Sequence, residues 1–176
     1  GDPLGPLYFC LAIKNLLGSL NSELHFGYLD DLTIGGDAKS VADDFIKIES
    51  AAVDLGLSLN RQKCEIIGHT DQSRDYFSSR GIILPEVDHT SATLLGSPLS
   101  ENKIDETLAQ KRQELKMISE RLSFMPSHDA LYLLRFVIAM PRLLYILRTA
   151  PCTGHNGLQL YDDLLKKIIN GTLNIE

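Results

Sequence analysis

The sequence contains few cysteines and only a short apolar run near its front, and both shortages exclude classes of protein. Its three cysteines, Cys10, Cys64 and Cys152, are odd in number and far apart, so they do not outline a disulfide framework. The apolar segment at residues 7–17 is too short to cross a bilayer and contains Lys14. The front of the sequence has no secretory pattern. We therefore expect an intracellular, soluble protein with no membrane partner.

Basic charge is also scarce, except in one stretch. The net charge is −6, and residues 1–60 hold three basic and nine acidic side chains. Residues 103–148 hold eight basic and five acidic side chains, which makes them the part with a basic surplus. An acidic surface repels phosphate backbones unless cations intervene. We do not expect this chain alone to bind nucleic acid tightly.

The first hundred residues alternate between helical and extended apolar patterns. Apolar residues at helical spacing predict a largely buried helix over residues 7–20. Two short apolar runs, residues 24–29 and 32–34, flank Asp30-Asp31 and predict a β-hairpin with that pair as its loop. A second amphipathic helix follows the hairpin. We expect an α+β region with an antiparallel sheet that has helices on one face.

Residues 101–176 have only helical patterns. Ser127 is a favourable N-cap for a helix that we expect to kink or break near Pro141. A last helix is predicted over residues 158–169. The change in pattern places a domain boundary near residue 100.

The pair Asp30-Asp31 is the strongest candidate for chemistry. A two-residue loop favours positive φ, which suits Gly or Asn better than Asp. Adjacent carboxylates repel each other, and in a low dielectric one takes up a proton unless a cation is present. Mg²⁺ prefers hard oxygen ligands and is held by one or two carboxylates together with substrate phosphates. The alternative is an exposed acidic turn that binds nothing.

Four segments, in order, resemble the motifs of reverse transcriptases of the retrotransposon type. Tyr28-Leu29-Asp30-Asp31 resembles the Tyr-x-Asp-Asp signature. Residues 1–7 resemble the Gln-Gly-x-Pro-x-(Gly/Ser)-Pro block without its leading Gln. Residues 56–65 resemble the motif Gly-Leu-x-x-Asn-x-x-Lys-(Ser/Cys/Thr), and residues 94–99 resemble the Leu-Gly primer-grip segment. The resemblance covers about residues 1–100.

This resemblance implies an RNA-directed DNA polymerase, with a partial palm at residues 1–100 and a thumb-like segment at 101–176. In that reaction a primer 3′-hydroxyl attacks the α-phosphate of a deoxynucleoside triphosphate. Two Mg²⁺ ions, which Mn²⁺ can replace, lie ~3.5–4 Å apart and stabilise the attacking and leaving oxygens. The partners implied are an RNA template, a DNA primer and deoxynucleotides.

The resemblance also implies roles for the hairpin residues. Asp30 matches the principal catalytic metal ligand of this hairpin, and Asp31 matches the secondary one. Tyr28 would lie beneath the end of the primer–template duplex, although its ring can also simply pack.

Further substrate contacts are implied outside the hairpin. Gly1 and Pro3 would shape the nucleotide pocket, where small residues allow close approach of the backbone. Lys63 would lie near the triphosphate, or would be a solvated surface lysine. Gly96 would let the backbone approach the primer, or would only serve a turn.

The family places a third metal-binding Asp on an earlier strand, before the residue 1–7 block. We therefore expect a fragment whose partner is the upstream fingers and palm segment of the same polyprotein, and which does not polymerise alone. One alternative is a non-catalytic remnant or a domesticated module that binds nucleic acid or protein. Another is an unrelated α+β module with a Ca²⁺- or Mg²⁺-binding acidic turn, although the spacing does not fit an EF-hand loop.

Overall fold

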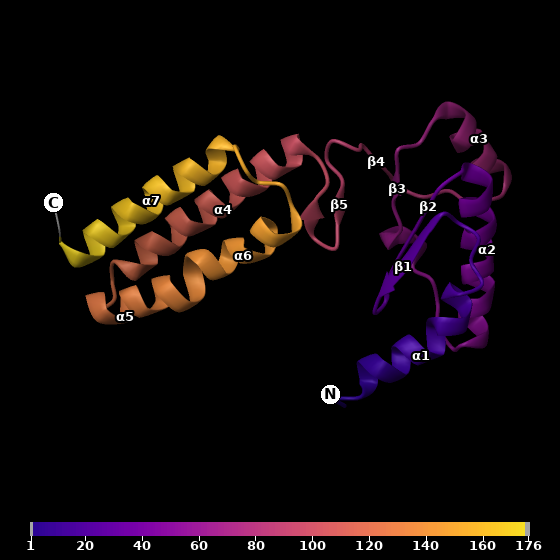
Figure 1. Ribbon diagram of the computed structural model, residues 1–176, viewed down its shortest axis with the longest axis horizontal. Helices are drawn as coiled ribbons and strands as arrows, with labels where there is room; N and C mark the ends of the chain where they lie inside the picture. Colours follow the sequence, from indigo (N-terminus) through magenta and orange to yellow (C-terminus); the bar gives the residue numbers. More distant parts are fainter. Residues whose placement is uncertain (1, 175–176) are drawn as a thin grey trace. The chain divides into compact units, whose positions relative to one another are not determined.

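The computed structural model describes residues 2–174 and divides the chain into two compact units, Gly1–Val87 and Asp88–Glu176 (Figure 1). Both helices and strands are present, which confirms the α+β class. Residues 88–100 belong to the helical second unit, whereas the division made from sequence joined them to the first part.

The first unit combines short strands with helices. It contains α1 (Gly5–Leu17), β1 (Leu24–Tyr28), β2 (Asp31–Gly35), α2 (Ala38–Asp54), η1 (Arg61–Lys63), β3 (Ile66–Ile67), α3 (Asp71–Ser79) and β4 (Glu86–Val87). The pair β1–β2 is antiparallel and the pair β3–β4 is parallel. Within residues 2–174 the strands form separate two-stranded pairs, and the single antiparallel sheet that we expected does not form.

The core of the first unit lies between α2 and α3. Ala42 and Phe45 of α2 pack with Phe77 of α3 and with Ile82. Ile34 of β2 packs against the same cluster. This contact fixes one face of the β1–β2 hairpin to the helices and leaves its other face for solvent or ligands.

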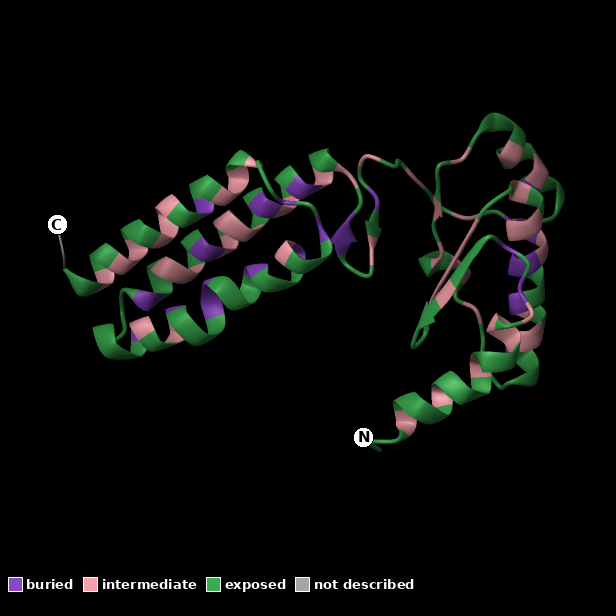
Figure 2. Cartoon of the chain, viewed as in Figure 1, coloured by how far each residue is buried: buried purple, intermediate pink, exposed green. Residues whose placement is uncertain are grey.

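Helix α1 forms where the sequence predicts a helix, but it is not buried. None of its residues is buried, and Leu7, Tyr8 and Leu11 are exposed (Figure 2). Its main neighbour is β1, where a Cβ added to Gly27 would lie 3.4 Å from Leu17 Cδ1. The prediction of a largely buried helix is wrong because a two-stranded ribbon covers only a small part of the apolar face of α1.

The second unit is a helical bundle preceded by a small hairpin. It contains β5 (Thr93–Leu94), β6 (Ser97–Pro98), α4 (Glu101–Leu122), α5 (Ser127–Leu133), the π-helical segment η2 (Leu134–Ile138), α6 (Met140–Thr149) and α7 (Asn156–Leu173). Ile104, Leu108 and Leu115 of α4 are fully buried at helical spacing, and Tyr161 of α7 joins the same core. The Ser100 hydroxyl caps α4 by accepting from the Lys103 N–H at 3.2 Å.

The helix that begins at Ser127 is interrupted just before Pro141, as predicted. Proline has no N–H to donate to the carbonyl four residues earlier, and its ring clashes with that carbonyl. The chain widens into a π turn, in which the Ala139 N–H donates to the Leu134 carbonyl at 2.9 Å. The buried Tyr161 hydroxyl donates to the Ala139 carbonyl at 3.2 Å and so satisfies an acceptor at the break.

The interrupted helix Ser127–Thr149 is long and apolar enough to cross a membrane by length and composition alone. A core helix of a soluble protein passes the same test, and 33% of the most apolar stretch is buried. Leu134 and Leu143 are among the side chains that it contributes to the helical core. Ser127 is the first residue of α5 and Pro126 occupies the cap position, so the predicted Ser127 cap is wrong.

Candidate functional site

The candidate site is the tip of the β1–β2 hairpin. The strands pair from Leu24↔Gly35 to Tyr28↔Asp31, so the two loop residues are Leu29 and Asp30. We expected Asp30-Asp31 as the loop, and the structure corrects this, because Asp31 is the first residue of β2. The hydrophobic pattern of the strands sets this register, since a slip by one residue would turn the apolar side chains of β2 away from the helices.

The hairpin loop holds a leucine in an unfavourable conformation. Leu29 has φ = 55°, and Asp30 is not among the residues with positive φ. Positive φ at the first loop position alone is the φ pattern of a type II′ turn, where Gly is preferred. The left-handed conformation costs a residue with a Cβ about 1–2 kcal/mol. We had expected the strain to fall on an Asp of the loop, but it falls on Leu29.

The two faces of the hairpin have different surroundings. Side chains alternate along a strand, so Gly27 faces α1 while its neighbour Tyr28 faces the other way. Tyr28 is 62% exposed and lies directly across from Asp31. The ring of Tyr28 and the carboxylate of Asp31 thus share the open face at the tip, and Asp30 lies beside them in the loop.

The two carboxylates at the tip have no partner among the described residues. Asp30 and Asp31 are both exposed. Within residues 2–174, no group of three or more His, Cys, Asp or Glu side chains is close enough to hold a metal ion. A pair of free carboxylates still fits Mg²⁺, because this ion retains several waters and takes further oxygens from substrate phosphates. The tip can therefore supply part of a metal site.

A buried carboxylate on α2 holds the segment that leads into β1. The Asn21 N–H, the Ser22 N–H and the Ser22 hydroxyl donate to Asp44 Oδ2 at 2.8, 2.7 and 2.6 Å. Asp44 is only 1% exposed. Burial raises the pKa of this carboxyl, but the hydrogen bonds from Ser22 and Asn21 outweigh burial and leave the pKa below its usual value.

Sequence reasoning missed Asp44, although a signal was present. The apolar stripe of α2 includes Val41, Phe45 and Ile48. Asp44 lies three residues after Val41 and four before Ile48, so it falls on the buried face of the helix. A charged residue in such a stripe is paired or hydrogen-bonded when the helix packs.

Lys63 lies at the end of the short helix η1 and is exposed. The neighbouring Arg61 is the residue that ties this turn to the rest of the unit. Its Nε and Nη2 atoms each donate to the Glu49 carboxylate at 2.6 Å, and Nη1 donates to the Gly81 carbonyl at 2.9 Å. Within residues 2–174, Lys63 forms no ion pair or side-chain hydrogen bond, so its charge is free for a ligand.

The glycine-proline block at the start of the chain forms an exposed turn. The Gly5 N–H donates to the Asp2 carbonyl at 3.0 Å, and the Leu4 N–H donates to Asp2 Oδ1 at 2.8 Å. Pro3 lies within this turn and is exposed. Gly1 lies outside the described residues. The turn leads directly into α1.

Gly96 lies in the loop of the second hairpin, β5–β6. Leu95 and Gly96 have φ = 50° and 79°, the φ pattern of a type I′ turn. The Tyr145 hydroxyl donates to the Leu95 carbonyl, and a Cβ added to Gly96 would lie 3.9 Å from Tyr145 Cε1. The structure thus groups Tyr28, Asp30 and Asp31 at one tip, while Gly96 belongs to the other unit.

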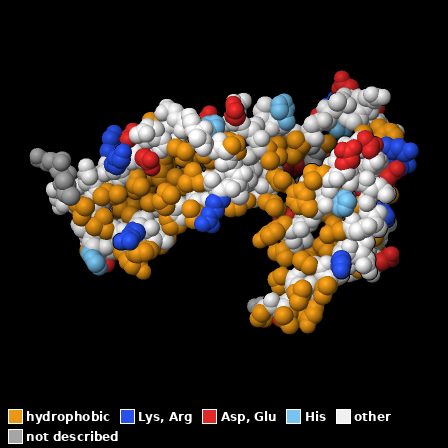
Figure 3. All heavy atoms as spheres, viewed as in Figure 1, with side chains coloured by type: hydrophobic (Ala, Val, Ile, Leu, Met, Phe, Trp, Pro, Cys, Tyr) orange, Lys and Arg blue, Asp and Glu red, His pale blue; other side chains and the backbone are white. Residues whose placement is uncertain are grey.

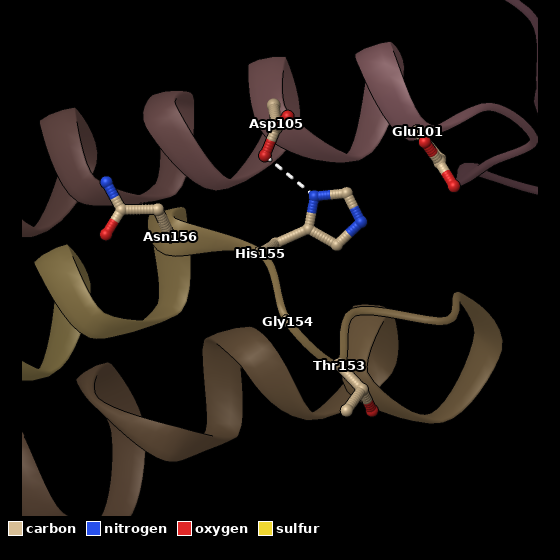
Figure 4. A pocket seen from close by; sticks show the side chains of 6 residues that line it. All are labelled: Glu101, Asp105, Thr153, Gly154, His155 and Asn156. Atoms are coloured by element: carbon tan, nitrogen blue, oxygen red, sulfur yellow. Dashed lines mark hydrogen bonds and ion pairs between the residues drawn. The ribbon is translucent and has the colours of Figure 1, made fainter.

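A second group of polar side chains lies between α4 and α7 (Figure 4). A pocket of about 400 Å³ is lined by Glu101, Asp105, Thr153, Gly154, His155 and Asn156. His155 Nδ1 lies 2.8 Å from Asp105 Oδ1, and this pair joins residues 50 positions apart in the sequence. Sequence reasoning did not find this pair, because nothing local connects its two members.

Comparisons with protein-family models, with curated proteins and with solved structures give no match to this chain. A functional conclusion therefore depends on the hairpin, on its two carboxylates and on the motifs in the sequence. Of these, the geometry of the hairpin is independent of any resemblance.

Proposed function

We propose that this chain carries the metal-binding hairpin of an RNA-directed DNA polymerase, with the first unit as part of its palm and the helices after it as a thumb. The observation that carries the proposal is a pair of adjacent carboxylates, without a partner among residues 2–174, beside a strained Leu29. A turn selected only for stability would favour Gly at the strained position and would separate the two negative charges. Backbone strain of this kind is concentrated at ligand-binding and catalytic sites.

Asp30 and Asp31 would hold the Mg²⁺ ions. When bound, the ions stabilise charge on the attacking and leaving oxygens of nucleotidyl transfer. Tyr28, on the same face as Asp31, offers an exposed ring against which the end of a primer–template duplex can rest. Lys63 supplies a free positive charge for a triphosphate.

The proposed site is incomplete within this chain. Two carboxylates and one free lysine supply only part of what two metal ions and a triphosphate need. An upstream segment of the same polyprotein would add the third carboxylate and the basic residues that hold the nucleotide. On this proposal the chain alone does not extend a primer.

Metal binding can be tested on the chain itself by titration with Mn²⁺, followed by the electron paramagnetic resonance signal of the free ion. We expect Asp30→Asn and Asp31→Asn each to weaken Mn²⁺ binding by about tenfold, because each substitution removes one of the two negatively charged carboxylates of the site. Asp54→Asn, which removes an exposed carboxylate from α2, is the matched control and should bind as the parent does. Equal Mn²⁺ affinity in all four proteins would contradict a metal site at the tip.

Activity can be tested by primer extension on an RNA template after the chain is fused behind a supplied fingers segment. Extension that requires Mg²⁺ and is lost in Asp30→Asn is the expected result. Mn²⁺ binding at the tip without extension by a folded fusion would favour the alternative, a non-catalytic remnant that retains the fold.

A further inference from the structure

The outer face of the broken helix in the second unit is apolar and uncovered. Four large apolar residues recur every four positions along α5, η2 and α6: Tyr132, Phe136, Met140 and Leu144. They are 60%, 55%, 50% and 37% exposed, in that order. Figure 3 shows hydrophobic side chains gathered over these helices, with Lys and Arg side chains beside them. We call these four residues the outer stripe. The inner residues of the same helices fill the core, so the outer stripe is a second apolar face of one broken helix.

The outer stripe has the composition of a protein interface. The centres of such interfaces are enriched in Tyr, Phe, Met and Arg and depleted in Lys, Glu and Asp. The Tyr132 and Phe136 rings lie 4.9 Å apart, and the Arg135 guanidinium lies 5.1 Å from the Phe136 ring centroid. Large side chains held by one another in this way lose less entropy when a partner binds.

Arginines predominate along the broken helix of the outer stripe, in which Asp129 of α5 is the acidic side chain. Residues 130–161 contain three arginines, Arg135, Arg142 and Arg148, and no Asp or Glu. Among residues 2–174, Arg142 pairs with Glu114 at 3.8 Å, whereas Arg135 and Arg148 form no ion pair. A second copy of this face would bring arginines against arginines, which disfavours a symmetric dimer here. A partner with carboxylates beside an apolar surface would match both the apolar outer stripe and the arginines beside it.

We propose that the outer stripe is a docking surface for an amphipathic helix of another protein, with an apolar face and acidic flanks. A helix presents side chains every three to four residues, which matches the spacing of the stripe, and its flanking carboxylates would meet Arg135 and Arg148. Nucleic acid would use the arginines but would leave four large apolar side chains without an apolar partner. This inference is independent of the metal site on the first hairpin.

The test uses the full chain and a fluorescent peptide of about 18 residues, five helical turns, with leucines on one face and glutamates beside them. We expect saturable binding by fluorescence anisotropy, and at least about tenfold weaker binding for Phe136→Ser combined with Met140→Ser. Val53→Ser, at a 70% exposed apolar position on α2, is the matched control and should bind like the parent. Exposed positions are chosen so that folding, checked by circular dichroism, is retained.

Charge reversal provides the second arm of the test. Arg135→Glu combined with Arg148→Glu should weaken the glutamate peptide by about tenfold and strengthen a matched peptide with lysines in place of the glutamates. The proposal is overturned if the glutamate peptide does not bind, or if Val53→Ser weakens it as much as the stripe substitutions do. It is also overturned if the stripe substitutions affect only an RNA–DNA hybrid or only vesicles of phosphatidylserine.

Discussion

The two antiparallel hairpins share a backbone feature and differ in their surroundings. Each has a two-residue loop that begins with a leucine at positive φ, Leu29 in β1–β2 and Leu95 in β5–β6. In β5–β6 the Leu95 carbonyl accepts from the Tyr145 hydroxyl, and the buried Ser97 donates to the Thr149 carbonyl at 3.3 Å. In β1–β2, no described side chain forms a hydrogen bond with either loop residue.

The contrast separates strain that packing explains from strain that it does not. A strained residue persists when its surroundings overdetermine its conformation. Contacts with α6 do this for Leu95, so its conformation requires no further cause. Leu29 lies in an exposed, acidic loop. On our proposal, a metal ion bound by Asp30 and Asp31 would stabilise the conformation of this loop.

The largest expected effect concerns Asp44, the buried carboxylate that holds the segment leading into the first hairpin. Asp44→Ala should destabilise the β1–β2 hairpin by about 3 kcal/mol, because Ser22 and Asn21 lose a buried charged acceptor. Hydrogen exchange of the amides in residues 24–35 measures this. Asp54→Ala on the exposed side of α2 should change the value by less than about 0.5 kcal/mol. Equal effects of the two substitutions would show that the base of the hairpin is held by something other than Asp44.

The same carboxylate should make the first hairpin, but not the second, sensitive to acid. The folded pKa of Asp44 is lowered, so its stabilisation is fully present above the unfolded-state pKa of about 3.9 and is lost as the pH falls through the folded value. Hairpin stability measured across this range should fall with pH, and Asp44→Asn should remove most of that slope. An unchanged slope in Asp44→Asn would assign the acid sensitivity to other carboxylates.

The hydrogen bond that supports the second hairpin can be removed by deleting one hydroxyl group, that of Tyr145. Tyr145→Phe should destabilise the second unit by about 1 kcal/mol in urea unfolding, because the Leu95 carbonyl loses its donor. The first hairpin should not respond. Tyr132→Phe, which removes an exposed hydroxyl from α5, is the matched control.

The smallest expected change tests the strain itself. Leu29→Gly should stabilise the first hairpin by about 0.5 kcal/mol, because relief of positive-φ strain slightly exceeds the entropy that glycine adds to the unfolded chain. If the strained loop orients the carboxylates, the same substitution should weaken Mn²⁺ binding, whereas Leu95→Gly should leave it unchanged. A loss of stability in Leu29→Gly would show that the leucine side chain, and not function, keeps the residue there.

Features set by local chemistry could be predicted from the sequence. The hairpin around Asp30, the break before Pro141 and the turn at Gly96 each follow from a few neighbouring residues. Features set by distant contacts could not. The place of Asp31 in β2 depends on which face of the strand meets the helices, and the exposure of α1 depends on how little sheet is available to cover it.

The candidate site divides in the same way. The acidic pair can be recognised in the sequence, because it lies between two short apolar runs that predict a hairpin. The strain on Leu29 and the support from Asp44 appear only once the register and the packing of α2 are known. The relation of Lys63 to the tip involves no described contact, so its role stays a prediction.

The π turn before Pro141 has a consequence for how the second unit tolerates change. A π turn holds one residue more than an α turn, and in an α-helix one residue corresponds to a rotation of about 100° and a rise of 1.5 Å. Loss of one residue within Leu134–Ile138 would therefore convert the π turn into an α turn, and Leu143 would keep its place in the core. We therefore expect a single deletion in this segment to be tolerated far better than one within the regular helices α4 or α7, where every later side chain would rotate by about 100°.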